Sequence, residues 1–190
     1  MKKLLIICFV LLHLCAFTQI DTTKKFEIKS GFGLLLDTWS YDKGSYVWTS
    51  FDYVMNPKYS ISLYAAHGNI TYTHFKNNAY KGAIIPSTYE IYEMNFYRRL
   101  MIKSNNQVRI GSGIYFRKYQ DARPDYYFTE NEIVLYISET TLYDIGPTFL
   151  LNYKHQWKNG FFMGFDARTW YVFALGIDYA MISPMIGISF

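Results

Sequence analysis

Apolar and polar residues alternate with a period of two over most of the chain beyond Asp21. In the first such segment, the even positions from Phe26 to Leu36 are mainly apolar, and the odd positions from Glu27 to Asp37 are mainly charged or glycine. Successive side chains of a β-strand point to opposite sides, so this spacing predicts a strand with two chemically different faces. Eight such segments follow one another without a convincing amphipathic helix. The sequence therefore predicts an all-β chain of antiparallel strands.

Short polar turns and two longer connections separate the expected strands. We expect strands over approximately residues 25–39, 46–55, 59–65, 88–102, 108–117, 139–155 and 161–168, and an eighth that ends at Phe190. Tight turns are expected at Asp42–Gly44, Asn56–Lys58, Ser104–Asn106 and Gln156–Gly160. The longer connections are expected at His74–Ser87 and Gln120–Ser138, and the second is acidic and aromatic.

The polar faces distinguish a soluble barrel, which has apolar residues inside, from a membrane barrel, which has them outside. Charged residues share these faces with glycines such as Gly31, Gly111 and Gly146. Glycine on a solvent-facing strand packs nothing, whereas in a narrow lumen it makes room for a neighbouring Tyr or Arg. We therefore place the charged face inside and the apolar face against lipid, where backbone pairing requires closure. The expected lumen charge network is Glu27, Lys29, Asp37, Glu93, Arg109, Arg117, Asp166 and Arg168.

The N-terminus has the features of a secretory signal peptide. Two lysines precede an apolar run from Leu4 to Leu14, and small residues at positions 16 and 18 precede Gln19. This run is too short and wrongly flanked for a membrane-spanning helix. We expect cleavage between Thr18 and Gln19, so that residues 1–18 form the signal peptide and residues 19–190 the barrel.

The expected signal peptide also contains both cysteines of the chain, Cys8 and Cys15, and two of its 19 basic residues. The mature chain is thus expected to lack disulfides and thiolate metal sites. Its 17 basic and 15 acidic residues give a net charge of +2, which does not indicate nucleic-acid binding. Hydrophobic residues make up 51% of the whole chain and charged residues 18%, a balance that excludes a disordered chain and a coiled coil.

The C-terminal segment alternates through Ile186, Ile188 and Phe190 and ends on an aromatic residue. This pattern resembles the signal by which outer-membrane barrels are handed to the barrel assembly machinery. Pro184 departs from the pattern, because proline has no ladder donor, and it predicts a bulge or a weakly paired position.

Together with the alternation, the charged face and the signal peptide, this segment makes the chain similar to the small outer-membrane barrels of the OmpA/OmpX-like kind, in the compact form common in the Bacteroidota. The resemblance covers essentially the whole mature chain. It implies an eight-stranded antiparallel up-and-down transmembrane β-barrel in the cell outer membrane. It also implies contact with outer-membrane lipids and lipopolysaccharide.

No catalytic residue, cofactor or metal site is expected. Two kinds of small barrel modify lipid A, and each has a characteristic residue pattern. Lipid A deacylases have a His-x-Ser pair on the barrel wall. Palmitoyl transferases have a loop His with an adjacent Asp-Ser. The mature histidines lie at positions 67, 74 and 155; none is followed two residues later by serine, and no Asp-Ser dipeptide occurs. His67 and His74 could bind a metal together with a loop acid, but no ligand spacing supports such a site, and solvated loop histidines are the simpler interpretation.

The connection between the fifth and sixth strands is the best candidate for binding a partner. It contains Asp121, Asp125, Tyr126, Tyr127, Phe128, Glu130 and Glu132. Acids at this place could share divalent cations with lipopolysaccharide, and exposed aromatics favour a protein partner such as a larger outer-membrane complex. The alternative is a solvated loop with aromatic residues at the membrane interface.

The sequence therefore favours a non-enzymatic integral outer-membrane barrel, acting as a structural protein or as an accessory subunit of an envelope complex. A filled lumen is expected, because the interior of an eight-stranded barrel is just wide enough for side chains to fill. Two alternatives stay open. One is a lipid A-modifying enzyme with an unrecognised site, and the other is a soluble periplasmic ligand-binding barrel with its two faces inverted.

Overall fold

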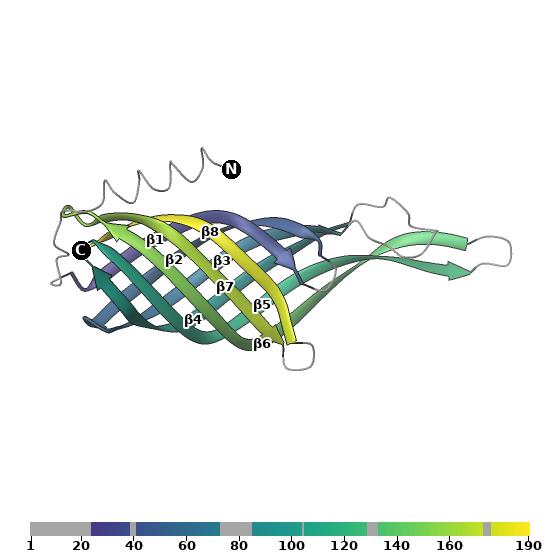
Figure 1. The fold of residues 1–190 in the computed structure, drawn as a ribbon. Helices are drawn as coiled ribbons and strands as arrows, with labels where there is room; N and C mark the ends of the chain where they lie inside the picture. Colours follow the sequence, from purple (N-terminus) through teal and green to yellow (C-terminus); the bar gives the residue numbers. More distant parts are fainter. Residues whose placement is uncertain (1–23, 39–40, 73–84, 104, 129–132, 173–175) are drawn as a thin grey trace.

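The computed structural model is a closed barrel of eight antiparallel strands, in which each strand pairs with its neighbours in sequence and β8 pairs with β1 (Figure 1). The strands are β1 (Phe26–Asp37), β2 (Lys43–Asn56), β3 (Tyr59–Tyr72), β4 (Ile85–Lys103), β5 (Asn106–Phe128), β6 (Ile133–Gln156), β7 (Phe161–Val172) and β8 (Gly176–Ser189). The structure describes residues 24–38, 41–72, 85–103, 105–128, 133–172 and 176–190. The expected fold class, an eight-stranded antiparallel up-and-down barrel, is confirmed. Among the residues described, no helix is long and apolar enough to cross a membrane.

The strands are staggered as barrel closure requires. Paired residues followed from Leu34 on β1 through β2 to β5 lead to Thr141 on β6. Followed the other way, through β8 and β7, they lead to Leu151 on the same strand. The two paths around the barrel thus reach β6 at positions ten residues apart, Thr141 and Leu151. Such a stagger goes with strands tilted from the barrel axis, as Figure 1 shows.

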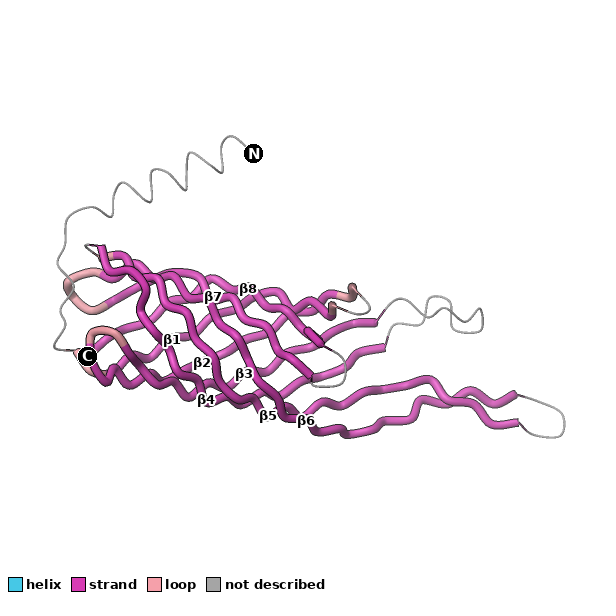
Figure 2. The backbone as a smooth tube through the Cα atoms, turned by 60° about the horizontal axis from the view of Figure 1, so that its bottom comes forward, coloured by secondary structure: helices cyan, strands magenta, loops and turns pink. Residues whose placement is uncertain are grey.

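The two ends of the barrel differ. At the turn end, where Phe26 and Phe190 lie, β2 and β3 are joined by a turn in which the Asn56 side chain accepts hydrogen bonds from the backbone N–H groups of Lys58 and Tyr59, at 2.8 and 3.0 Å. At the opposite loop end, β5 and β6 continue past the other strands as a two-stranded hairpin (Figure 2). Of this hairpin beyond Gln120, the backbone alone is described.

Hydrogen bonds between the first and last strands close the barrel. The Phe26 N–H donates to the Phe190 carbonyl at 3.0 Å, and the Phe190 N–H donates to the Phe26 carbonyl at 2.9 Å. Near Pro184 the pairing goes from Gly31↔Met185 to Leu34↔Ile182 without a change of register. Pro184 is thus weakly paired with β1, which is one of the two expected outcomes. It does not form a bulge, because proline removes one hydrogen-bond donor without adding a residue to the strand.

The expected loop over Gln120–Ser138 is wrong. Residues up to Phe128 belong to β5, and residues from Ile133 belong to β6, with Phe128 paired to Ile133. The physical reason is the composition of both arms, since Tyr126–Phe128 and Ile133–Ile137 are aromatic, β-branched and other apolar residues that favour extended pairing.

Other strand ends also extend beyond the expected bounds. The expected turn at Asp42–Gly44 is wrong in part, because Lys43 and Gly44 already pair within β2. The third strand runs to Tyr72 and the fourth begins at Ile85, so the longer connection expected at His74–Ser87 is partly strand. Polar residues near the loop end are compatible with a strand because pairing, and not burial of an apolar face, fixes the backbone there.

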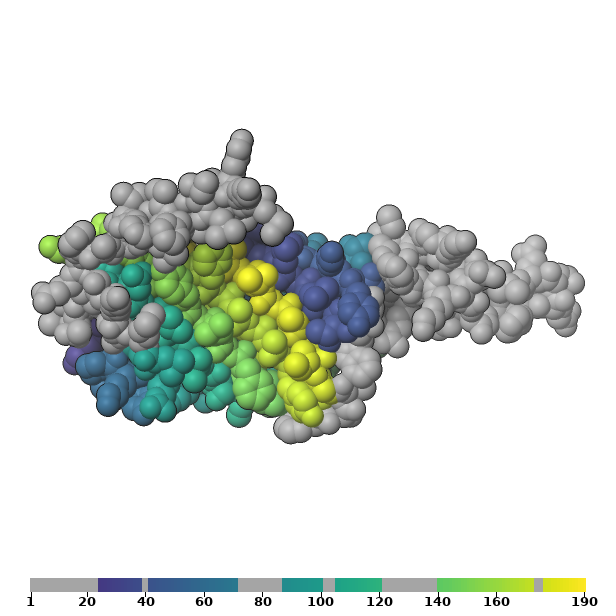
Figure 3. Space-filling view, viewed as in Figure 1, coloured from purple at the N-terminus to yellow at the C-terminus, as the bar shows by residue number. Residues whose placement is uncertain are grey.

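Apolar side chains face outward on every strand of the barrel. Phe32, Leu63 and Ile145 are 59, 58 and 65% exposed, while the alternate positions of the same strands are mostly buried. Figure 3 shows one side of this wall, where β7 and β8 (green to yellow) lie side by side. This distribution excludes a soluble barrel with inverted faces, in which apolar residues would fill the interior.

Interior glycines lie where a neighbouring large side chain occupies the space. A Cβ on Gly31 would lie 2.6 Å from the Trp48 indole nitrogen and 2.5 Å from the Pro184 carbonyl oxygen. A Cβ on Gly187 would lie 2.4 Å from the Phe162 ring. All three distances are shorter than a Cβ atom tolerates, so close packing inside the barrel requires glycine at both positions.

Replacing Gly31 by valine should therefore destabilise the barrel. Forcing extra methyl groups against Trp48 should lower the free energy of unfolding by about 1–3 kcal/mol. Ser30→Val is the matched control, because Ser30 is the adjacent residue and faces outward. Urea unfolding in detergent, followed by tryptophan fluorescence, measures both. Equal stability of the two variants would contradict the packing argument.

Candidate functional site: the charged interior

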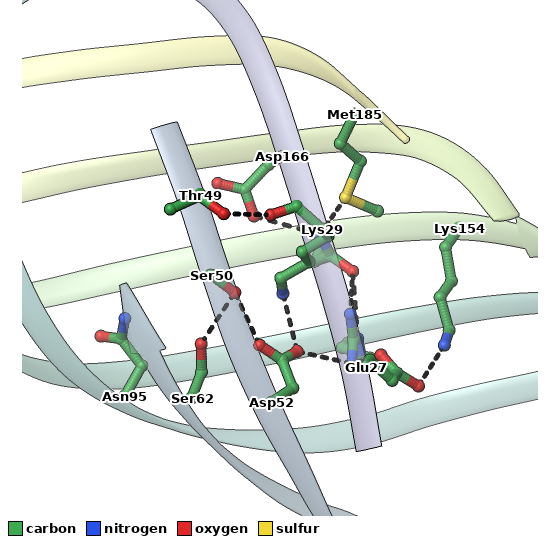
Figure 4. A network of polar contacts seen from close by, with 12 residues as sticks. Glu27, Lys29, Thr49, Ser50, Asp52, Ser62, Asn95, Lys154, Asp166 and Met185 are labelled. Atoms are coloured by element: carbon green, nitrogen blue, oxygen red, sulfur yellow. Dashed lines mark hydrogen bonds and ion pairs between the residues drawn. The ribbon is translucent and has the colours of Figure 1, made fainter. Parts of the chain in front are cut away.

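Five charged residues meet inside the barrel near its turn end and form what we call the turn-end cluster: Glu27, Lys29, Asp52, Arg109 and Lys154. Figure 4 labels all of them except Arg109. Glu27 on β1 forms ion pairs with Lys154 on β6 at 2.5 Å and with Arg109 on β5 at 3.1 Å. Asp52 on β2 forms ion pairs with Lys29 at 2.8 Å and with Arg109 at 3.3 Å. Strands β1 and β5 are opposite in the strand order, so these contacts cross the interior.

Asn152 links the turn-end cluster to a second group of residues. Its side-chain oxygen accepts from Arg109 at 2.8 Å, and its amide nitrogen donates to Asp166 at 3.0 Å. Asp166 in turn accepts from Arg168 at 2.6 Å. Arg168 also donates to Glu93 at 2.5 Å, which joins β7 to β4 across the barrel.

The second group, which we call the mid-barrel cluster, consists of Glu93, Asp166 and Arg168. Glu93 accepts two further hydrogen bonds, from the Trp170 indole at 2.6 Å and from the Asn95 amide at 2.8 Å. The Arg168 guanidinium lies 3.5 Å from the centre of the Tyr64 ring, a cation–π contact in addition to its two carboxylate partners.

The buried charges of these two clusters are paired. Four carboxylates face four bases, and each of the eight residues is at most 4% exposed: Glu27, Asp52, Glu93 and Asp166 with Lys29, Arg109, Lys154 and Arg168. Arg99 adds a fifth base beside them, because its guanidinium lies 3.9 Å from the Glu27 carboxylate and its side chain is 6% exposed. A buried charge is costly unless it is paired and hydrogen-bonded. Each base of the two clusters has a carboxylate partner. Positive and negative side chains thus lie next to one another, and the requirement is met.

Arg117 is the centre of a third group at the loop end, the loop-end cluster. It donates to Asp144 on β6 and, at 2.6 Å, to Asp178 on β8. Four tyrosine rings surround its guanidinium, with centroids 4.6 to 5.9 Å away: Tyr89, Tyr115, Tyr119 and Tyr179. A guanidinium is well suited to this setting, because it combines bidentate hydrogen bonding with stacking on aromatic faces.

The structure places seven of the eight expected network residues in the three clusters, and the eighth, Asp37, lies in none of them. Glu27, Lys29 and Arg109 lie in the turn-end cluster, Glu93, Asp166 and Arg168 in the mid-barrel cluster, and Arg117 in the loop-end cluster. Asp37 is buried at the loop end of β1, the opposite end of that strand from Glu27.

Sequence reasoning missed four members of these clusters. Asp52 and Lys154 occupy the same parity as the polar residues of their strands, so the alternation alone could have identified them. Asp144 shares the parity of Lys154 on β6 and could have been identified in the same way. Asp178 could not be found in this way, because a register shift at Trp170 separates it from the inward-facing odd positions of β8.

Five of the seven expected partner residues lie on the part of β5 that leads into or forms the projecting hairpin. Asp121, Asp125 and Tyr126–Phe128 belong to β5, whereas Glu130 and Glu132 lie outside the described residues. Of the histidines, His67 faces outward, and the His155 ring bonds to the Asn106 side chain at 3.0 Å. His74 lies outside the described residues. Within the described part of the chain, no three His, Cys, Asp or Glu residues come together to hold a metal ion.

Comparison with known proteins identifies the fold. No family model matches the chain, and no curated protein matches its sequence. It is similar in structure to the outer-membrane protein OprG from Pseudomonas aeruginosa, with a TM-score of 0.58 and 12% identity over 91% of this chain and 96% of that chain. It is also similar to Neisserial surface protein A, with a TM-score of 0.55 and 9% identity over 87% and 96%. A third match is the N-terminal β-barrel domain of Pseudomonas aeruginosa OprF, with a TM-score of 0.53 and 10% identity over 88% and 98%. At these identities the likeness concerns the fold, which is that of small eight-stranded outer-membrane barrels.

Removing Arg109 should test the importance of the turn-end cluster for stability. Arg109→Met leaves Glu27 and Asp52 with one base fewer, which should lower the free energy of unfolding by about 3–5 kcal/mol. Arg98→Met is the matched control, because Arg98 is exposed on the outer wall and pairs in register with Ile110, the neighbour of Arg109. The control should change stability by no more than about 0.5 kcal/mol. Similar losses in both variants, measured by equilibrium urea unfolding, would show that the cluster does not stabilise the barrel.

Proposed function

We propose that this chain is an integral outer-membrane β-barrel that is closed to solutes and acts without enzymatic activity, as a structural protein or as an accessory subunit of an envelope complex. After export, cleavage near Thr18 would release the barrel, and the segment ending in Ile186, Ile188 and Phe190 would present it to the barrel assembly machinery. The contact of Arg109 and Lys154 with Glu27 across the interior is the observation that carries the closed-barrel part of the proposal.

The geometry of the interior supports a closed barrel. Ion pairs connect β1 to β5 and to β6, and β4 to β7, so charged side chains extend between walls that lie far apart in strand order. An eight-stranded barrel is just wide enough for its side chains to fill. A pore would need these pairs to separate, and separating one member of a buried ion pair is costly.

The outer wall supports a membrane location. On β3, β4 and β5, outward side chains are mainly apolar up to one row of paired residues, His67, Glu90 and Lys118, which we call the boundary row. At the turn end, the Phe26 ring contacts the rings of Tyr53 and Phe190, with centroids 5.4 and 6.0 Å apart. An apolar band that ends in aromatic residues on one side and polar ones on the other is typical of a barrel in a bilayer.

The hairpin of β5 and β6 supports a role in contacting a partner. Strand β4 pairs with β5 as far as Asp121, and β7 pairs with β6 from Thr148 onward. Within the described residues, the arms beyond these points pair with each other alone. Unpaired strand edges are templates for pairing with another chain, and an isolated two-stranded ribbon is marginally stable in water. Asp121, Asp125 and Tyr126–Phe128 lie on one arm of this proposed contact element.

The absence of a pore can be measured directly. Purified protein reconstituted in planar bilayers should give no discrete conductance steps, with a general porin as the positive control. The protein should also stay in the membrane fraction after carbonate extraction and require detergent for release. Stable conductance steps of the unaltered protein would refute the closed barrel, and release by carbonate would refute the membrane location. A changed lipid A mass spectrum in a deletion strain would favour the enzymatic alternative.

The accessory role depends on the hairpin and can be tested by shortening it. Replacing residues 124–137 by a two-residue Asn-Gly turn joins the paired residues Arg123 and Ser138, removes the hairpin arms beyond them, and keeps the paired residues of β4–β5 and β6–β7. The shortened chain should fold, as judged by heat-modifiable gel mobility. If the hairpin binds a partner, cross-linked envelope complexes of the unaltered chain should disappear. Complexes of unchanged size would argue against the hairpin as the contact element.

A further inference from the structure

Two buried arginines lie directly opposite each other at the turn end of the interior. Arg99 on β4 is paired in register with Arg109 on β5, and the side chains are 6 and 0% exposed. Like charges directly opposite one another in a sheet are destabilising, so this pair needs negative charge close by.

The negative charge that these arginines receive is shared with a third base. Arg99 and Lys154 approach the same oxygen of Glu27, Oε1, at 3.9 and 2.5 Å, and Arg109 approaches the other oxygen at 3.1 Å. Figure 4 shows the Lys154 ammonium at the Glu27 carboxylate. One carboxylate thus lies within ion-pair distance of three bases.

The two clusters and Arg99 together contain one base more than they contain acids. The turn-end cluster has three bases and two acids, the mid-barrel cluster has one base and two acids, and Arg99 is the fifth base. A buried charge without a counter-charge is costly, and an arginine cannot lose its proton to remove it. The excess lies at the turn end, where bases outnumber acids, and it calls for one negative counter-charge there.

Arg99 has an unused donor at the turn-end mouth of the interior. Its Nε–H is buried, and no acceptor among the described residues forms a hydrogen bond with it. Its Nη1 donates to the Pro57 carbonyl at 3.4 Å, so the guanidinium lies level with the β2–β3 turn. Gln107 is buried and paired in register with Lys154, and it adds a neutral amide on the same side. Cationic donors and a neutral amide are the groups that an anion requires.

The surface around this mouth is also basic. Lys25, Lys58 and Lys158 are exposed there, and the described turns Asn56–Tyr59 and Trp157–Gly160 contain no acidic residue. Charges of one sign around an opening raise the local concentration of counter-ions. An anion from the solution on this side of the barrel is therefore attracted to the mouth.

We infer that the turn-end mouth binds one small monovalent anion of the halide class, such as chloride, between the Arg99 Nε–H and the Lys154 ammonium. One such ion cancels the excess of one positive charge, whereas a dianion would reverse it. A small ion also suits an interior that side chains largely fill. The ion would be bound in the closed barrel whether or not the hairpin contacts a partner.

Chloride dependence of unfolding tests the site in the unaltered chain. The protein is unfolded with urea in an uncharged detergent, while sodium gluconate is replaced stepwise by sodium chloride at constant ionic strength. Gluconate is too large for the buried site. Above the dissociation constant, the unfolding equilibrium constant should therefore fall about tenfold for each tenfold rise in chloride. Equal stability in the two salts would overturn the proposal and would indicate that a lysine of the cluster has lost its proton instead.

Arg99→Met removes the excess charge together with one donor. The variant should lose the chloride dependence and, in gluconate, should be at least as stable as the unaltered chain, in contrast to the loss expected for Arg109→Met. Arg98→Met is the matched control, because Arg98 is the adjacent residue and is exposed on the outer wall, and it should keep the dependence. Chloride dependence that persists in Arg99→Met, or that disappears in both variants, would overturn the site.

The position of bromide gives a readout that needs no variant. Crystals of the unaltered chain grown with sodium bromide should show an anomalous scattering peak beside the Arg99 Nε and the Lys154 ammonium. Peaks confined to the protein surface would show adventitious ions only and would overturn the proposal.

Discussion

Pairing of β1 with β8 satisfies the backbone hydrogen-bonding groups that an open sheet would leave at its two edges. Lipid offers no hydrogen bonds to replace them, so closure is the condition under which this wall can carry apolar side chains on its outer face. Closure with eight strands also fixes a narrow interior. Side chains from all strands converge there, and their charges must neutralise one another over short distances.

The interior meets that requirement through residues that each contact more than one partner. Arg109 binds Glu27, Asp52 and Asn152, and Arg168 binds Asp166 and Glu93. Planar guanidinium groups suit this task because several donors lie in a fixed fork. Glycines provide the remaining space, and the stability of the barrel thus depends on paired charges and close packing inside, while the apolar face is turned outward.

Alternation was enough to predict antiparallel strands, because the period of two survives over most of every strand. The composition of the polar face, with its charges and glycines, was needed to assign that face to the interior. It also placed Glu27, Arg109 and Arg168 inside. It could not show that Arg109 meets Glu27, since that contact depends on the stagger of the closed barrel and not on local spacing. Asp178 was beyond reach because a register shift moves it out of the alternation, and the hairpin was misjudged because its acids suggested a loop although its aromatic and β-branched residues favour strands.

The outer wall is unequal around the barrel, and this inequality bears on the proposed contact element. On β1 and β8, the apolar residues Leu34 and Ile177 are exposed near the loop end, whereas β3 to β5 turn polar at the boundary row. The hairpin of β5 and β6 rises beyond that row, past the point at which β4 stops pairing with β5. The base of the hairpin is thus adjacent to the polar side of the wall. A partner that pairs with the hairpin would meet it outside the apolar band and would leave the charged interior unchanged.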